Sequence, residues 1–444
     1  MTKFVRIGRS TVGRVLMVWI VVSVALAIVG GYLGFSRPRW GWLLLVIAAV
    51  MVEIIHAFYP RIEQYIPFVG VGIGVFARSL AQWRTWWPRV LTRRRPYLWF
   101  LLYLLVIAVA TVVAIDPRVS LRYAVGVPAV LWITTLYFPF LAHDGAMTIR
   151  KLAQSWAIIG SVLAVSAGIG AVVFHSGFPV PVGHRVILAW QWPFANKNTL
   201  GMMMTFAVPA AFGLIFHPRQ MSSARRGVSI ALFVLTVLGD ALSYSRSGWI
   251  AAAIGVGVFV MAFFGRKGFI GMLIGVPLAF VALVLKTGIH RWELLWHKGL
   301  NGRTVLWRAG FRALQHHWWF GVGPGNSPQA ILPYVPSVYA GVTPQDSILR
   351  TAVEIGLVGL TIWLVIVVGG VLRLARQFWL NRRSATSRWE ITMVGSLLLA
   401  TLAQQMVESL FLGGVSFGDF FFTILISWVW MMEFQGRHAR LGSD

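Results

Sequence analysis

Residues 152–174, LAQSWAIIGSVLAVSAGIGAVVF, form an uncharged run of 23 residues. A helix needs roughly 20 consecutive apolar residues to cross the hydrocarbon core of a bilayer, so this run is long enough to be a transmembrane span. The whole chain of 444 residues has the same character, because 58% of its residues are hydrophobic, only 12% are charged and the mean hydropathy is +0.74. This composition excludes a soluble globular enzyme.

Apolar runs of this kind recur along the chain and predict twelve spans. They cover residues 15–34, 42–58, 97–115, 123–141, 152–174, 200–216, 228–242, 249–264, 269–285, 348–372, 391–410 and 415–432. The Gly-rich run at residues 66–76 is too short to cross and is interpreted as an interfacial or re-entrant piece. A thirteenth span there would invert the topology of everything after it.

The distribution of Lys and Arg supports this topology, because cytoplasmic loops of membrane proteins carry an excess of cations. With the N-terminus inside, 25 of the 39 basic residues fall on inner segments. We therefore expect an all-α polytopic membrane protein with about twelve transmembrane helices and both termini cytoplasmic. Residues 1–444 form a single integral membrane domain, and residues 287–345 form a long extracytoplasmic loop that carries short helices.

The charge and the cysteine content limit which partners and cofactors the protein can use. The basic residues behind the net charge of +26 lie in short loops between spans. This placement favours anionic membrane lipids over nucleic acid as the binding partner. The chain has no cysteine, which excludes disulfides, thiolate nucleophiles and Cys-ligated metals. His316 and His317 are neighbours and lack the spacing of a shared metal site, so we expect no metal and no cofactor.

The long loop contains a predicted helix at residues 301–314. In this helix Trp307, Phe311 and Leu314 form an apolar stripe, and Arg308 and Arg312 share a neighbouring face. One interpretation is a helix lying on the bilayer with its arginines reaching the headgroups. The other is phosphate capture, in which an arginine at the helix start, Arg303, and the free helix N–H groups bind one anion.

A second arginine, Arg246, lies in the very short outer connection SYSRSG. A cation at the bilayer edge needs a partner, so Arg246 either pairs with Asp240 or binds an anion itself. Two arginines on one outer face suit a diphosphate, which offers several oxygens to planar guanidinium donors.

Acidic and amide side chains accompany these arginines. Asp346, Arg350 and Glu354 are spaced i, i+4, i+8 on one predicted helix face. Asp346 is either the N-cap of this helix or, like Glu354, a candidate general base beside bound phosphate. The next span carries a polar stripe that must face the bundle interior or a hydrated cavity, formed by Thr401, Gln404, Gln405 and Glu408.

Two further motifs lie on the outer side. In FANKNTLG, Asn198 is interpreted as a helix cap, and Asn196 and Asn198 are also candidates for hydrogen bonding to sugar. The motif FGVGPGN lacks the Lys-Ser/Thr of a phosphate loop, so it is interpreted as turns.

Taken in order, FANKNTLG, SYSRSGW, GRTVLWRAGFRAL, FGVGPGN and TPQDSILRTAVEIGLVGL resemble the O-antigen ligase and Wzy-type O-antigen polymerase family over residues 190–360. The resemblance implies an inverting, metal-independent glycosyltransferase that takes a glycan from undecaprenyl diphosphate and passes it to a glycan or lipid acceptor. The implied location is the bacterial cytoplasmic (inner) membrane, with the active site facing the periplasm or cell exterior. It also implies that Arg246 and Arg303 hold the diphosphate.

The chain departs from the family at one position. Family ligases carry a His-Asn pair just before the tenth span, where this sequence has Gln345-Asp346. An amide does not accept a proton at neutral pH as an imidazole does. The general base is therefore Asp346 or a histidine of the long loop, or the reaction needs little help from a base.

Three functions remain open at this stage. Loss of the histidine favours a polysaccharide polymerase, with a chain-length regulator as a further partner. The alternative is a ligase that passes a finished glycan to lipid A core or another surface acceptor. A third class is a transporter or flippase that uses the intramembrane acids Glu53, Glu354 and Glu408.

Overall fold

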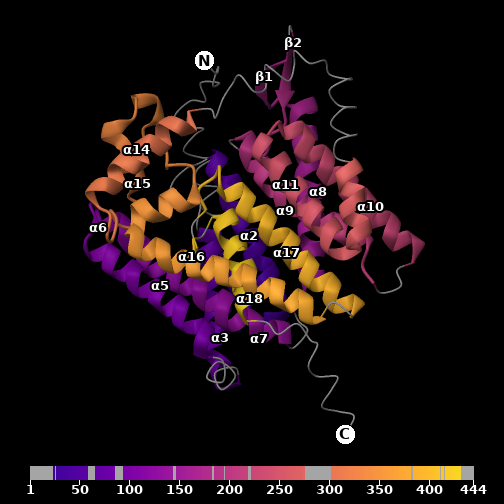
Figure 1. Cartoon of the computed structure of the whole chain (residues 1–444), viewed down its shortest axis with the longest axis horizontal. Helices are drawn as coiled ribbons and strands as arrows, with labels where there is room; N and C mark the ends of the chain where they lie inside the picture. The colour runs from indigo at the N-terminus through magenta and orange to yellow at the C-terminus, as the bar shows by residue number, and fades with distance from the viewer. Residues whose placement is uncertain are drawn as a thin grey trace.

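The computed structural model describes a bundle of helices with one β-hairpin (Figure 1). The residues described are 24–25, 27–58, 66–85, 94–143, 147–182, 185–194, 196–218, 222–275, 302–381, 384–410, 412–414 and 416–431. The first half contains α2 (Pro38–Phe58), α3 (Ile66–Ala81), α5 (Arg94–Val112), α6 (Pro117–Leu131), the π-helix η2 (Trp132–Tyr137), α7 (Phe138–His143) and α8 (Ile149–Val173). The rest contains β1 (Phe178–Val182), β2 (Arg185–Ala189), α9 (Lys197–Ile215), α10 (Ser223–Ser243), α11 (Arg246–Phe264), α14 (Arg303–His316), α15 (Ser327–Ile331), the 3₁₀ turns η3 (Leu332–Tyr334) and η4 (Ser337–Tyr339), α16 (Ser347–Asn381), α17 (Ala385–Gln405) and α18 (Phe417–Met431).

The helical membrane character predicted from the sequence is confirmed. Six described helices are long and apolar enough to cross a membrane: Pro117–Tyr137, Ile149–Val173, Lys197–Ile215, Ser223–Ser243, Arg246–Phe264 and Ser347–Asn381. Shorter apolar helices include Trp40–Ile54, Tyr97–Val112 and Gly418–Trp430. The first, ninth and twelfth predicted spans, residues 15–34, 269–285 and 415–432, lie partly outside the described residues.

Large aliphatic side chains cover the outside of the bundle. On α8 they are spaced three or four residues apart and form one exposed face, made of Ile158, Val162, Val165, Ile169 and Val172. In water such a face would be an aggregation site, whereas in a bilayer it meets lipid tails at no cost. The exposed apolar surface therefore agrees with a multi-pass membrane protein.

The helix α9 lies in the middle of one group of helices and packs against α8, α10, α11 and α17. Small residues let these helices approach closely, because a side chain added at Gly160 of α8 would meet Ala207 of α9. Close backbone approach of this kind is typical of membrane helices, which gain little from burying apolar surface.

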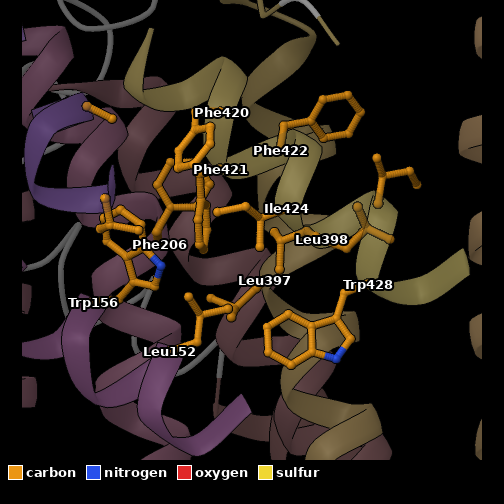
Figure 2. Close-up of a cluster of buried hydrophobic side chains, with 14 of the residues drawn as sticks. Leu152, Trp156, Phe206, Leu397, Leu398, Phe420, Phe421, Phe422, Ile424 and Trp428 are labelled. Carbon is orange, nitrogen blue, oxygen red and sulfur yellow. The ribbon is translucent and has the colours of Figure 1, made fainter. Parts of the chain in front are cut away.

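An aromatic cluster joins α8 and α9 to the C-terminal helix α18. Figure 2 shows the rings of Trp156, Phe206 and Phe421 gathered together. The Phe421 centroid lies 4.3 Å from the centroid of Trp156 and 4.3 Å from that of Phe206. Such edge-to-face pairs add about 0.5–1.5 kcal/mol beyond area burial, so α18 is fixed against the middle of the bundle.

The Gly-rich run at residues 66–76 belongs to the 16-residue helix α3, whose glycines allow backbone contact, since a side chain added at Gly74 would meet the carbonyl of Gly31. The all-α expectation needs one correction. The loop before α9 contains an antiparallel hairpin, in which β1 pairs with β2 from Phe178 opposite Ala189 to Val182 opposite Arg185. The prolines Pro179 and Pro181 of FPVPV hid this strand in the sequence, because proline is rare inside sheets.

Candidate functional site

Ends of helices that are far apart in sequence meet at one end of the bundle. The start of α9 contacts the turn between α10 and α11, where Lys197 Nζ donates to the Tyr244 carbonyl at 2.6 Å. The same turn contacts the end of α17, because Gln404 Nε2 donates to Ser247 Oγ at 3.4 Å. The sequence assigns all three segments to the outer side, so the structure brings parts of the predicted outer face together.

Arg303 opens α14 and is buried, with 9% of its surface exposed. Its Nη2 donates to Glu408 Oε1 at 2.9 Å, whereas its Nε has no hydrogen-bond partner among the described residues. The preceding residue, Gly302, has no side chain to cap the helix start, which carries the positive end of the helix dipole. An unpaired guanidinium N–H beside an uncapped helix start is suited to an anion.

The two faces of α14 have different partners. Its buried face consists of Leu306, Ala309, Gly310 and Ala313 and packs on the start of α16. The predicted stripe of Trp307, Phe311 and Leu314 is not the main packing face, since Phe311 is 60% exposed. Arg308 and Arg312 are exposed on the outward part of the helix, away from the buried position of Arg303.

Arg246 opens α11 after the N-cap Ser245 and is half-buried. The carboxylate Oδ1 of Asp240 is buried without a hydrogen-bond partner among the described residues, so this oxygen does not pair with Arg246. Ser247, which follows Arg246, contacts Gln404, and Gln404 lies one helical turn before the acid that binds Arg303. The two predicted diphosphate arginines therefore lie beside the same end of α17.

The polar stripe on α17 faces the protein interior, as predicted. Thr401 and Gln404 are fully buried and Gln405 is 3% exposed. Gln404 Oε1 accepts a hydrogen bond from Thr205 Oγ1 at 3.4 Å. Both polar atoms of the Gln405 amide are buried without partners among the described residues, which marks a place for polar ligand atoms.

Glu408 lies just beyond the end of α17 and forms an ion pair with Arg303. The Glu408 side chain is 22% exposed, more than twice the 10% of Arg303. Burial raises the pKa of Glu408 above its ordinary value of 4.5, and the charge and hydrogen bond of Arg303 oppose this shift. Its backbone is fixed to α16, because Ser347 Oγ donates to the Glu408 carbonyl at 3.0 Å.

Asp346 is the N-cap of α16, one of the two roles expected from the sequence. Its Oδ1 accepts from the Leu349 N–H at 2.7 Å. Burial raises the pKa of Asp346, and the backbone hydrogen bonds from Leu349 and Ile348 lower it. The preceding Gln345, at the family's histidine position, has left-handed backbone geometry with φ of 52°.

Glu354 is completely buried, and both of its carboxylate oxygens accept hydrogen bonds. Oε1 accepts from Arg350 Nε at 2.9 Å and from Ser327 Oγ at 2.7 Å. Oε2 accepts from the Gly325 N–H at 2.9 Å. These partners are all protein groups, so the carboxylate holds the glycine loop onto α16.

The motif FGVGPGN forms turns, as predicted. Gly321, Gly323 and Gly325 have φ values of 72°, 91° and 79°, a region that glycine adopts without steric cost. The motif ends at Asn326, whose Nδ2 donates to Ser120 Oγ at 2.9 Å. This bond ties the loop to the start of α6.

The helix α16 is broken at Gly356, where φ is 71°. The loop completes the interrupted hydrogen bonding: the Val322 N–H donates to the Val353 carbonyl at 2.9 Å. On the other side of the break, the Leu357 N–H donates to the Trp318 carbonyl at 2.7 Å. Irregular backbone inside a membrane protein must be satisfied by other protein groups, and this loop satisfies it.

The predicted cap of α9 was placed two residues too late. Asn196 is the N-cap, because its side chain accepts from the Asn198 N–H at 2.9 Å. Asn196 is exposed and Asn198 is half-buried at the first turn of the helix, next to Lys197. Both amides therefore lie at the same end of the bundle as the arginines.

The described histidines of the long loop lie away from this site. His316 and His317 are exposed at the end of α14, roughly 20 Å from its start at about 1.5 Å per residue. No group of three metal-binding side chains occurs among the residues that the structure describes.

Sequence reasoning missed the part played by two charged residues. Lys197 appeared only as part of a motif, and its contact with the α10–α11 turn places a third cation near Arg246. Glu408 appeared only as one member of the polar stripe. Its ion pair with Arg303 joins residues 105 positions apart, which no local pattern indicates.

The comparisons with known proteins concern the segment that contains most of these motifs. No curated protein matches the chain. A family model described as O-antigen ligase matches residues 231–364. The matched segment includes four of the five motifs that carry the resemblance, with both Arg246 and Arg303, whereas FANKNTLG precedes it. Residues 231–364 are therefore similar to the O-antigen ligase family, which confirms the resemblance to the O-antigen ligase and Wzy-type family over this segment.

Proposed function

We propose that the protein is an inverting, metal-independent glycosyltransferase that transfers or polymerises undecaprenyl-diphosphate-linked glycan at the outer face of the bacterial cytoplasmic membrane. The observation that carries this proposal is Arg303, a buried arginine with an unpartnered Nε at an uncapped helix start. A diphosphate supplies the oxygens and the negative charge that such a position favours.

The second arginine of the diphosphate site is Arg246, at the start of α11. The start of α11, which carries Arg246, and the start of α14, which carries Arg303, both contact the end of α17 or the residues just after it. Charge developing on the leaving diphosphate is stabilised by such fixed donors, which need no reorganisation during the reaction. The Asn196 and Asn198 amides at the start of α9 are the proposed contacts for sugar hydroxyls.

A polysaccharide polymerase is the preferred activity, because Gln345 replaces the histidine that family ligases use. A ligase that passes finished glycan to lipid A core or another surface acceptor is the second candidate, supported by the description of the matching family. A transporter is disfavoured, because Glu354, one of the three acids considered for ion coupling, is held by three hydrogen bonds from protein groups.

The proposed topology has twelve spans, cytoplasmic termini and an active site that faces the periplasm or cell exterior. The exposed Arg308 and Arg312 flank the exposed Phe311, a combination suited to anionic lipid headgroups. We expect these lipids as partners, together with a glycan or lipid acceptor and a chain-length regulator, and no nucleic acid.

The test compares carrier-linked glycans from strains that express the wild type, Arg303→Ala or Arg118→Ala. Arg118 is an exposed arginine near the start of α6 and serves as the matched control. Arg303→Ala should leave membrane insertion intact and abolish transfer. Collapse of carrier-linked chains to single repeat units identifies a polymerase, and long chains retained on the carrier identify a ligase. Wild-type glycans in the Arg303→Ala strain would refute the diphosphate site.

A further inference from the structure

The proposed transfer needs a group that takes a proton from the acceptor hydroxyl, and the residues expected from the sequence are poorly placed for this. Glu354 is fully buried, and both its oxygens are engaged. Asp346 Oδ1 is held by the first turn of α16. Gln345 is an amide and does not accept a proton at neutral pH. His316 lies at the far end of α14 from Arg303.

Glu408 differs from these residues in position and in partners. Although hydropathy includes it in the predicted span 391–410, it lies three residues beyond the end of α17. It contacts Arg303 directly and keeps 22% of its side chain exposed. Its backbone is held by α16 through Ser347, so its side chain can exchange partners without movement of the chain. A partly exposed carboxylate whose backbone is held in place can reach both Arg303 and a bound substrate.

The ion pair makes Glu408 and a diphosphate competitors for the same guanidinium. Arg303 has five N–H groups, of which Nη2 binds Glu408 and Nε is unpartnered. A diphosphate that takes Nε and neighbouring N–H groups brings a second anion beside the carboxylate. Mutual repulsion then weakens the hold of Arg303 on Glu408 and makes the carboxylate a stronger base.

Binding at Arg303 also places the reacting atoms next to Glu408. In the glycan donor, the diphosphate is bonded directly to the anomeric carbon of the sugar. A donor held by Arg303 therefore has its sugar within reach of the Glu408 side chain.

We infer that Glu408 is the general base of the transfer, an inference that rests on the proposed glycosyltransferase function. The acceptor hydroxyl oxygen forms the new bond to the anomeric carbon while its proton passes to the Glu408 carboxylate. The bond between the anomeric carbon and the diphosphate oxygen breaks, and the electron pair leaves on undecaprenyl diphosphate, held by Arg303. The protonated Glu408 then releases its proton to water at its exposed side.

The experiment uses the full-length protein in liposomes with undecaprenyl-diphosphate-linked glycan extracted from the native strain. Turnover and binding of undecaprenyl diphosphate are measured separately for wild type, Glu408→Gln, Glu408→Asp and Arg303→Ala. Glu408→Gln should lose about 10²- to 10⁴-fold in turnover, the usual contribution of a general base, and bind undecaprenyl diphosphate at least as tightly as wild type. Glu408→Asp should keep part of the turnover, and Arg303→Ala should lose binding.

The matched control is Asp116→Asn, which also converts an acid to an amide. Asp116 is the N-cap of α6, and Asn caps helices equally well, so this variant should turn over like wild type. Wild-type turnover in Glu408→Gln would overturn the inference and leave the proposed function standing. Loss of binding together with turnover in Glu408→Gln would also overturn it, because that result indicates a structural role. A wild-type protein that forms no glycosidic bond would refute the proposed function itself.

Discussion

Arg350 and Glu354 form an ion pair one helical turn apart within α16, with Nε and Oε1 separated by 2.9 Å. Glu354 is completely buried, and Arg350 is 7% exposed. Arg350 also donates to the Ser409 carbonyl at 3.1 Å, so the pair links α16 to the segment after α17. Removal of one partner leaves an uncompensated buried charge, which is far more costly than removal of both.

We therefore expect Glu354→Gln to lower the free energy of unfolding by about 3–5 kcal/mol, the usual cost of breaking a buried ion pair from one side. The double variant Arg350→Met/Glu354→Gln should recover part of this loss. Thermal unfolding in detergent measures both effects. A Glu354→Gln protein that unfolds at the wild-type temperature would contradict the assignment of Glu354 as the anchor of the glycine loop.

Replacement of Gly356 by Ala should disrupt the break in α16. The added Cβ would meet the Trp319 carbonyl, and the positive φ of 71° strains any residue with a side chain. The strain alone costs about 1–3 kcal/mol, and displacement of the loop adds to it. Gly126→Ala in α6 is the control, since a Cβ there meets nothing within 4 Å. Equal melting temperatures for the two variants would show that the break is not required.

Gly302→Ala tests the start of α14. A Cβ at Gly302 would meet the Tyr339 hydroxyl, so either the tyrosine ring or the helix start that carries Arg303 must shift. With the added strain of the positive φ, we expect transferase activity to fall at least tenfold, which corresponds to about 1.4 kcal/mol. Gly341→Ala separates strain from collision, because Gly341 has a similar φ of 80° with open space around it. Activity assays on both variants distinguish the two causes. Equal losses of activity would mean that backbone strain, and not collision with Tyr339, lowers the activity.

Asp346 should make stability depend on pH. Its pKa is raised by burial in the folded chain above the ordinary value of 3.8, so the folded state binds the proton more tightly than the unfolded state. This contribution to stability is complete below the ordinary pKa and is lost as the pH rises through the raised pKa. Asp346→Asn keeps the N-cap and does not titrate.

The melting temperature of Asp346→Asn minus that of wild type should therefore increase as pH rises, measured between about pH 4 and pH 8. Glu408 is present in both proteins, so its own titration cancels in this difference. A difference that is constant with pH, or that decreases, would show that Asp346 titrates at or below its ordinary pKa in the folded protein.

Hydropathy predicted the helical membrane fold because long apolar runs have few alternatives in a bilayer. Residue type and spacing predicted that the α17 stripe faces inward and offered the N-cap as one of two roles for Asp346, because both features depend on neighbouring residues. The hairpin at Phe178–Ala189 was missed, since prolines obscure its strand pattern.

The candidate site was predicted only in part. Arg246 and Arg303 were identified from their positions in loops. The sequence did not show that Glu408 binds Arg303, or that Glu354 accepts a hydrogen bond from the glycine loop. These contacts join segments that are distant in the sequence. Local spacing places residues on helix faces, but it does not reveal which distant group reaches them.

Surface loops usually tolerate insertions and deletions, because few contacts depend on their length. The segment from Trp318 to Gly325 should not, since its carbonyls and amides complete the broken backbone of α16 and hold Glu354. One added residue would shift every one of these partners out of register. This stretch of the loop before α16 is therefore subject to length constraints as strict as those of a helix in the core of the bundle.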